Sequence, residues 1–116
     1  MFQEFKKVIF KTEGAAGALK NIVEGYPGIT QAFIYGSYAK NREKETSDID
    51  LMVIGQFPRK ELTRQIRELE SRLGREINFI SYTPEEFEKE RKKAGGFLHL
   101  VLKDKKFVLK GTLNGR

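Results

Sequence analysis

Residues 36–54 read GSYAKNREKETSDIDLMVI, and the rest of the chain is arranged around this stretch. An apolar run, residues 32–35, leads into it, and a second apolar run begins at Asp48 after a polar segment. Side chains alternate between the two faces of a strand, so Asp48 and Asp50 should project from one face while Ile49 points to the other. Two carboxylates are therefore predicted to converge above a buried strand.

The paired carboxylates indicate a site for metal and phosphate. Two like charges held close together repel each other unless a cation lies between them. Magnesium is a hard cation that accepts carboxylate oxygens together with substrate phosphates. Gly36 lets the backbone approach a ligand closely, and Ser37 offers a hydroxyl and an amide where a helix is expected to begin. The stretch thus combines donors for phosphate with acceptors for metal.

Three further segments support a family assignment. They are residues 33–39 (FIYGSYA), residues 74–78 (GREIN) and residues 82–87 (YTPEEF). With the Asp48-Ile49-Asp50 motif, they resemble the nucleotidyltransferases of the DNA polymerase beta superfamily, above all the small stand-alone type called minimal nucleotidyltransferases. The resemblance implies a single nucleotidyltransferase domain over residues 1–116.

The resemblance also implies a site and a reaction. Asp48 and Asp50 match the two carboxylates that hold magnesium on a nucleoside triphosphate. Gly36 and Ser37 match the turn that cradles the outer phosphates, and Lys40 lies where it can neutralise them. The implied enzyme transfers a nucleoside monophosphate, from ATP above all, to a hydroxyl acceptor. In the minimal type this acceptor can be a protein side chain on a helical toxin domain, which makes the transferase an antitoxin.

One position departs from the pattern of active family members. These use a third carboxylate on a neighbouring strand to activate the acceptor hydroxyl, and the matching position here is Asn78. An amide cannot act as a general base near neutral pH, and it carries no charge for a second metal. Glu76, two residues earlier, shares a strand face with Asn78 and is either a substitute carboxylate or an exposed charge at the strand end. Whether the protein turns over is therefore open.

Composition favours anionic partners. The 116-residue chain has a formal net charge of +6 and fits one domain with one core. It has no cysteines, and no apolar stretch is long enough for a membrane span or a signal peptide, so the cytoplasm is the expected location. The lysines of residues 103–110 form a basic region that is read as a solvated face.

Periodicity predicts an α/β or α+β domain with a mixed sheet, helices mainly on one face and the site at the other. Strands are expected at residues 31–35, 48–54, 76–81 and 107–109, the last at an edge. Helices are expected at residues 12–24, 59–73 and 84–93, and residues 97–102 are expected to form a short helix or strand.

Two other functions compete with the enzyme. A nucleotide-binding or regulatory interaction module without turnover would be marked by Asn78. A nucleic-acid-associated accessory would use the basic charge, although the segment before Phe33 is too short for a helix-turn-helix. Among the aromatic residues, Tyr35, Tyr38, Phe79 and Tyr82 either stack on a base or belong to the core, and no oligomeric state is predicted.

Overall fold

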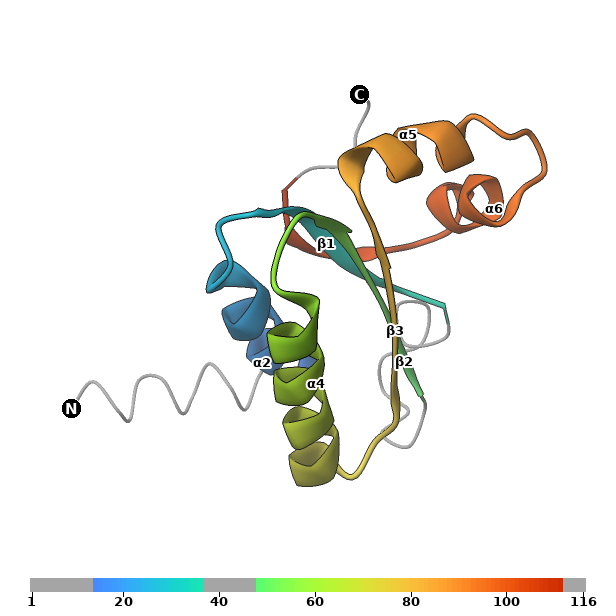
Figure 1. The fold of residues 1–116 in the computed structure, drawn as a ribbon. Helices are drawn as coiled ribbons and strands as arrows, with labels where there is room; N and C mark the ends of the chain where they lie inside the picture. The colour runs from blue at the N-terminus through green and yellow to red at the C-terminus, as the bar shows by residue number, and fades with distance from the viewer. Residues whose placement is uncertain (1–13, 37–47, 112–116) are drawn as a thin grey trace.

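The computed structural model describes residues 14–36 and 48–111 (Figure 1). Within these residues the strands form a four-stranded sheet, accompanied by helices on both faces. The strands are β1 (Ile29–Tyr35), β2 (Ile49–Gly55), β3 (Ile77–Tyr82) and β4 (Phe107–Lys110). The helices are α2 (Ala15–Glu24), α4 (Arg59–Leu73), α5 (Pro84–Arg91) and α6 (Phe97–Lys103).

The sheet is mixed, as predicted from the sequence. Its strands follow the order β3-β2-β1-β4. Strand β1 runs antiparallel to both β2 and β4, whereas β2 and β3 are parallel. Parallel neighbours need a crossover connection, and α4 provides it between β2 and β3. The strand β4 lies at an edge of the sheet, which was also expected.

One face of the sheet is covered by the two longer helices, α2 and α4 (Figure 1). Leu62, Ile66 and Leu69 lie on one side of α4 and are almost fully buried. They pack with Leu19 and Val23 of α2 against inward-facing side chains of all four strands. Full burial of one such aliphatic side chain contributes roughly 1.5–3 kcal/mol, so this layer supplies much of the stability.

The short helices α5 and α6 pack against the opposite face (Figure 1). Phe87 of α5 and Leu98 of α6 are buried against Phe33 of β1 and Met52 of β2. Residues 97–102 were predicted as either helix or strand, and the structure shows a helix. The two central strands are therefore covered on both faces along this part of their length.

Local sequence signals set the helix boundaries. The N-terminus of α5 carries a capping box, in which Thr83 Oγ1 accepts a hydrogen bond from the Glu86 amide at 3.1 Å and Glu86 Oε1 accepts one from the Thr83 amide at 3.0 Å. Helix α4 ends at Gly74, which adopts a left-handed conformation. No helix among the described residues has both the length and the apolar character that a membrane span requires.

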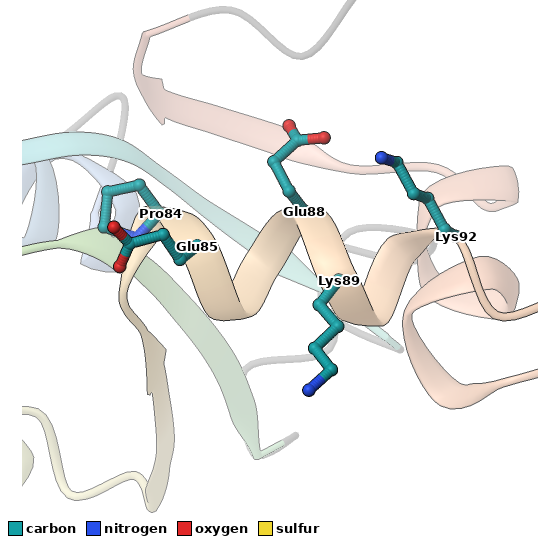
Figure 2. Close-up of a pocket in the computed structure, with 5 residues that line it drawn as sticks. All are labelled: Pro84, Glu85, Glu88, Lys89 and Lys92. Carbon is teal, nitrogen blue, oxygen red and sulfur yellow. The ribbon is translucent and has the colours of Figure 1, made fainter.

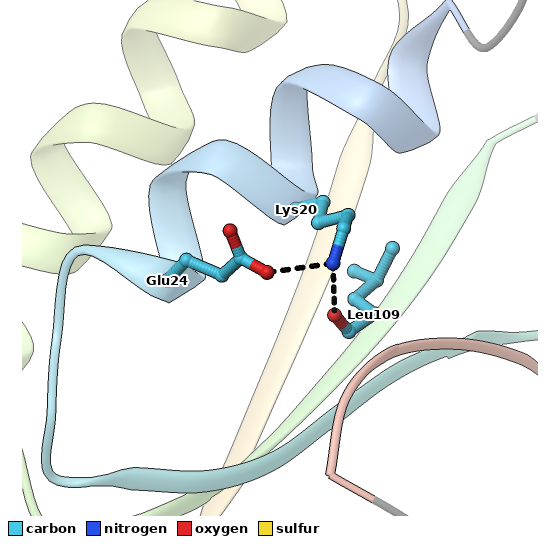
Figure 3. Close-up of polar contacts among 3 residues, drawn as sticks. All are labelled: Lys20, Glu24 and Leu109. Atoms are coloured by element: carbon cyan, nitrogen blue, oxygen red, sulfur yellow. Dashed lines mark hydrogen bonds and ion pairs between the residues drawn. The ribbon is translucent and has the colours of Figure 1, made fainter.

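Two lysines connect the helical layer to the edge strand. Lys20 Nζ on α2 donates to Glu24 Oε2 at 2.6 Å and to the Leu109 carbonyl on β4 at 3.5 Å (Figure 3). Lys110 Nζ on β4 donates to the Tyr26 carbonyl at 3.0 Å. Part of the basic region predicted to be a solvated face therefore binds backbone carbonyls.

A carboxylate at the end of α4 holds the start of β3. Glu70 Oε2 accepts a hydrogen bond from the Ile77 amide at 2.7 Å. Arg67 Nη1 lies 3.0 Å from Glu70 Oε1 and donates to the Ile77 carbonyl at 3.1 Å. The bond from the Ile77 amide, assisted by Arg67 and opposed by burial, lowers the pKa of Glu70.

We expect Glu70→Gln to lower the free energy of unfolding at pH 7 by about 1 kcal/mol, because a charge-assisted hydrogen bond becomes a neutral one. A lowered folded-state pKa stabilises the fold above the unfolded-state pKa, and this contribution disappears as the pH falls through the folded-state value. The difference from the unaltered protein should therefore shrink below the usual pKa of 4.5.

Urea unfolding between pH 7 and pH 3 measures this difference. Glu68→Gln on the same helix is the matched control, because its 3.7 Å ion pair with Arg64 is exposed and screened by solvent. Equal losses for the two variants, or a Glu70→Gln loss that does not change with pH, would contradict the role given to Glu70.

Candidate functional site

The two aspartates lie where β2 begins. Ile49 and Leu51 point into the layer under α2 and α4, so Asp50 projects from the opposite face, and Asp48 directly precedes the strand. Asp48 is exposed and Asp50 is half-buried. The alternation predicted from the sequence therefore holds for Asp50, which lies on the sheet face where α5 and α6 pack.

Asp50 is held by residues of both neighbouring strands. Tyr35 of β1 and Asn78 of β3 are its direct partners in the sheet register. Asn78 Nδ2 donates a hydrogen bond to Asp50 Oδ1 at 3.0 Å. Asn78, which matches the third carboxylate of the family that the sequence resembles, therefore acts on Asp50 as a hydrogen-bond donor.

Gly36 lies against the other oxygen of the same carboxylate. Its φ is +76°, and a Cβ atom at this position would lie 2.5 Å from Asp50 Oδ2. Any larger residue would therefore be strained and would displace Asp50. The turn after β1 therefore lies beside the Asp50 carboxylate. Ser37 and Lys40, the other predicted phosphate-binding residues, lie outside the described residues.

Tyr35 forms the inner wall of this site. Burial above all, together with the nearby Asp50 carboxylate and Tyr82, raises the pKa of Tyr35 to about 12. The phenol is therefore neutral at physiological pH and is no candidate for a general base. Its ring lies edge to face with Phe33 at 6.1 Å and with Phe97 at 6.0 Å.

The acidic residues fit a metal that is shared with a ligand. Asp48 and Asp50 supply carboxylate oxygens, the donor type that Mg²⁺ prefers. Within residues 14–36 and 48–111, no three acidic, histidine or cysteine side chains come together as a metal-binding group. Glu76 is exposed, and its carbonyl accepts the Ile49 amide at 2.9 Å. Two carboxylates are enough for Mg²⁺ when water molecules and the phosphate oxygens of a substrate supply its other ligands.

The other predicted aromatic residues are mostly packed. Phe79 lies on the α2 and α4 side of the sheet, whereas Tyr82 contacts Phe87 of α5 with ring centroids 6.4 Å apart. Tyr38 lies outside the described residues. A hollow along α5 is lined by Pro84, two glutamates and two lysines (Figure 2). Its charges cancel, so it offers no field that would attract a phosphate group.

Comparison with known proteins decides the family. Residues 18–108 match the family described as Polymerase beta, Nucleotidyltransferase. The chain belongs to this family. The resemblance stated from residues 33–39, 74–78 and 82–87 is thereby confirmed.

A relative in Methanocaldococcus jannaschii named "Putative protein adenylyltransferase" is 46% identical over 57 residues. The match covers 47% of this chain and 61% of that relative, so it spans less than two thirds of the relative's length.

Two solved structures share the fold. One is a mutant of the toxin–antitoxin MntA–HpeT, with 17% identity, a TM-score of 0.55, and coverage of 84% of this chain and 74% of that one. The other is a toxin–antitoxin with AMP-PNP, with 19% identity, a TM-score of 0.56, and coverage of 85% and 75%. At these identities the comparison supports the fold alone, and the nucleotidyltransferase fold predicted from the sequence is confirmed.

Sequence reasoning did not find two contacts of this family member's site. The hydrogen bond between Asn78 and Asp50 depends on the parallel register of β2 and β3, which the sequence does not specify. The contact between Tyr35 and Phe97 joins β1 to a helix 62 positions later in the chain. Phe97 lies in an apolar run, and its exposure could not be read from the residues around it.

We expect Gly36→Ala and Gly95→Ala to destabilise the protein by similar amounts, about 1–2 kcal/mol, because both glycines have φ near +77°. Only Gly36→Ala should displace Asp50, since a Cβ at Gly95 meets no atom within 4 Å. Unfolding measures the first effect, and the NMR signal of the Asn78 side-chain amide reports the second. An unchanged Asn78 signal in Gly36→Ala would contradict the close approach to Asp50.

Proposed function

We propose that this chain is a Mg²⁺-dependent nucleotidyltransferase that transfers AMP from ATP to a hydroxyl group of a protein. Membership of the family supports nucleotidyl transfer in general. The observation that carries the assignment of the site is the contact between the Gly36 turn and the Asp50 carboxylate. The turn is suited to binding phosphate and the carboxylate to binding metal, and the two are so close that a Cβ atom at Gly36 would clash with Asp50 Oδ2.

The transfer is a displacement at the α-phosphorus of ATP. The acceptor oxygen forms a bond to this phosphorus, the bond to the pyrophosphate oxygen breaks, pyrophosphate leaves, and the hydroxyl proton is lost. Asp48 and Asp50 would hold Mg²⁺, which when bound neutralises phosphate charge and stabilises the attacking and leaving oxygens. Gly36 permits the close approach of the phosphates, and Ser37 and Lys40 would bind them from the segment that follows.

Asn78 limits what the chain itself can do for the acceptor. Its amide has no site that takes up a proton near neutral pH. Its Nδ2 instead orients Asp50 by donating to Oδ1. The acceptor proton must therefore pass to water, to Glu76 or to a group on the acceptor.

The acceptor is proposed to be a protein for two reasons. The relative from Methanocaldococcus jannaschii has the name of a protein adenylyltransferase, and both structural neighbours are toxin–antitoxin proteins. A partner protein in a toxin–antitoxin pair would place a side-chain hydroxyl at the open end of β2, where Asp48 is exposed.

A second function is favoured by Asn78. A site that binds ATP and Mg²⁺ but lacks a general base would serve as a nucleotide-dependent regulatory module. The two functions share the binding site and differ in turnover, so binding and transfer have to be measured separately.

We expect the double variant Asp48→Asn/Asp50→Asn to lose Mg²⁺-dependent ATP binding, because amides carry no charge to hold the metal. The fold should persist, since the side chains are exposed or half-exposed and their mutual repulsion is relieved. Isothermal titration of ATP with Mg²⁺ and with a chelator measures binding, and thermal unfolding verifies the fold.

The matched control is Glu85→Gln/Glu88→Gln, which removes two negative charges from exposed positions on α5 (Figure 2). It should leave ATP affinity unchanged. If the unaltered protein bound ATP equally well with Mg²⁺ and with chelator, the proposed metal site would be wrong.

We expect Asn78→Asp to raise nucleotidyl transfer roughly 10²–10⁴-fold if the absent base limits turnover. Transfer of labelled AMP to a partner protein, or to the chain itself, is measured with Mg²⁺ or Mn²⁺. Asn78→Ala removes the hydrogen bond to Asp50 without adding a base and should show no gain.

If Glu76 already supplies the base, Asn78→Asp should change little and Glu76→Gln should lower transfer. Absence of transfer in both the unaltered chain and Asn78→Asp, with ATP binding intact, would reject the enzyme in favour of the regulatory module.

A further inference from the structure

An aromatic side chain beside the site is open to solvent. Phe97, Leu100 and Val108 are the exposed large apolar residues of the described chain, with 50%, 59% and 43% of their surface exposed. Phe97 is the aromatic one. A single exposed apolar side chain is common on protein surfaces, so the significance of Phe97 depends on its orientation and on its neighbours.

The Phe97 ring is held in a defined place. The next residue of α6, Leu98, is 1% exposed, and Val101 one turn later is 8% exposed, so buried side chains anchor the helix on the sheet. The ring meets Tyr35 at 6.0 Å with an interplanar angle of 76°. In such an edge-to-face pair Tyr35 covers at most one face of Phe97. The ring is thus oriented, with a face available to a ligand.

Tyr35 connects Phe97 to the aspartates. Tyr35 is paired with Asp50 across β1 and β2, and paired residues of antiparallel strands project from the same face. Opposed Cβ atoms are about 5 Å apart, so Phe97 lies on the order of 10 Å from Asp50 once the ring contact is added. A ribose between the α-phosphate and the base spans a distance of this order.

We propose that Phe97 binds the nucleobase of the nucleoside triphosphate by stacking. The inference rests on the proposed function, in which the triphosphate lies against Gly36 and the aspartates. From there the sugar and base would extend along the sheet face of Asp50 and Tyr35, where Phe97 is the exposed aromatic side chain among the described residues. A protein partner is the less favoured occupant, because Phe97 adjoins Tyr35 of the site directly, whereas Val108 is paired with Phe33, two positions before Tyr35 on β1.

The test compares two ligands that share a triphosphate. Titrations with ATP and with inorganic tripolyphosphate, both with Mg²⁺, are made on the full chain and on Phe97→Ala. Loss of base stacking should weaken ATP binding roughly 5- to 100-fold and leave tripolyphosphate binding unchanged. Phe97→Leu, which keeps an apolar side chain without a ring, should show most of the same loss. Val108→Ala is the matched control and should bind both ligands as the unaltered protein does.

A second measurement does not depend on losing affinity. The chain has no tryptophan, so Phe97→Trp introduces a single tryptophan at the proposed stacking position, whose emission is excited apart from that of the four tyrosines. ATP with Mg²⁺ should quench its fluorescence, and tripolyphosphate with Mg²⁺ should not. Circular dichroism confirms that each variant is folded.

The outcomes separate this inference from the proposed function. If Phe97→Ala binds ATP as tightly as the unaltered protein, or loses ATP and tripolyphosphate equally, the stacking role of Phe97 is wrong and the phosphate and metal site stands. If the unaltered protein binds neither ligand in the presence of Mg²⁺, both the proposed function and the stacking role are overturned.

Discussion

The double-sided burial of β1 and β2 is the constraint on which the rest of this structure depends. Ile34 and Leu51 face the layer of α2 and α4, while Phe33 and Met52 face the layer of α5 and α6. Neither strand can place a charged side chain along this stretch without a large desolvation cost. Polar chemistry is therefore restricted to the strand ends, and Asp48 and Asp50 lie at the end where β2 begins.

Around Asp50, the two neighbouring strands, β1 and β3, contribute three contacts. The turn after β1 approaches one carboxylate oxygen, Asn78 of β3 donates to the other, and Tyr35 lies opposite on β1. A carboxylate that is fixed on both sides needs little reorganisation when it binds a cation, and this is the property that a preorganised site requires. The same contacts explain why a side chain at Gly36 would displace Asp50.

The helices α5 and α6 contribute both to the core and to the surroundings of the site. These helices complete the core with Phe87, Leu98 and Val101, and they also bring Phe97 to the aspartate face of the sheet. A segment near the C-terminus of the described chain thus borders a site formed by β1 and β2. In a small domain, core packing and ligand recognition share the same short helix, because few elements are available for either task.

By itself the sequence determined the features that depend on neighbours in the chain. Strand alternation puts Asp50 on the face opposite Ile49 and Leu51, and the Thr83-Pro84-Glu86 capping pattern starts α5, because backbone geometry sets both over a few residues. Only the tertiary structure decided that Asn78 donates to Asp50 and that Phe97 reaches Tyr35. These contacts follow from the parallel register of β3 and the docking of α6, which depend on packing between segments distant in sequence and leave no local periodicity to read.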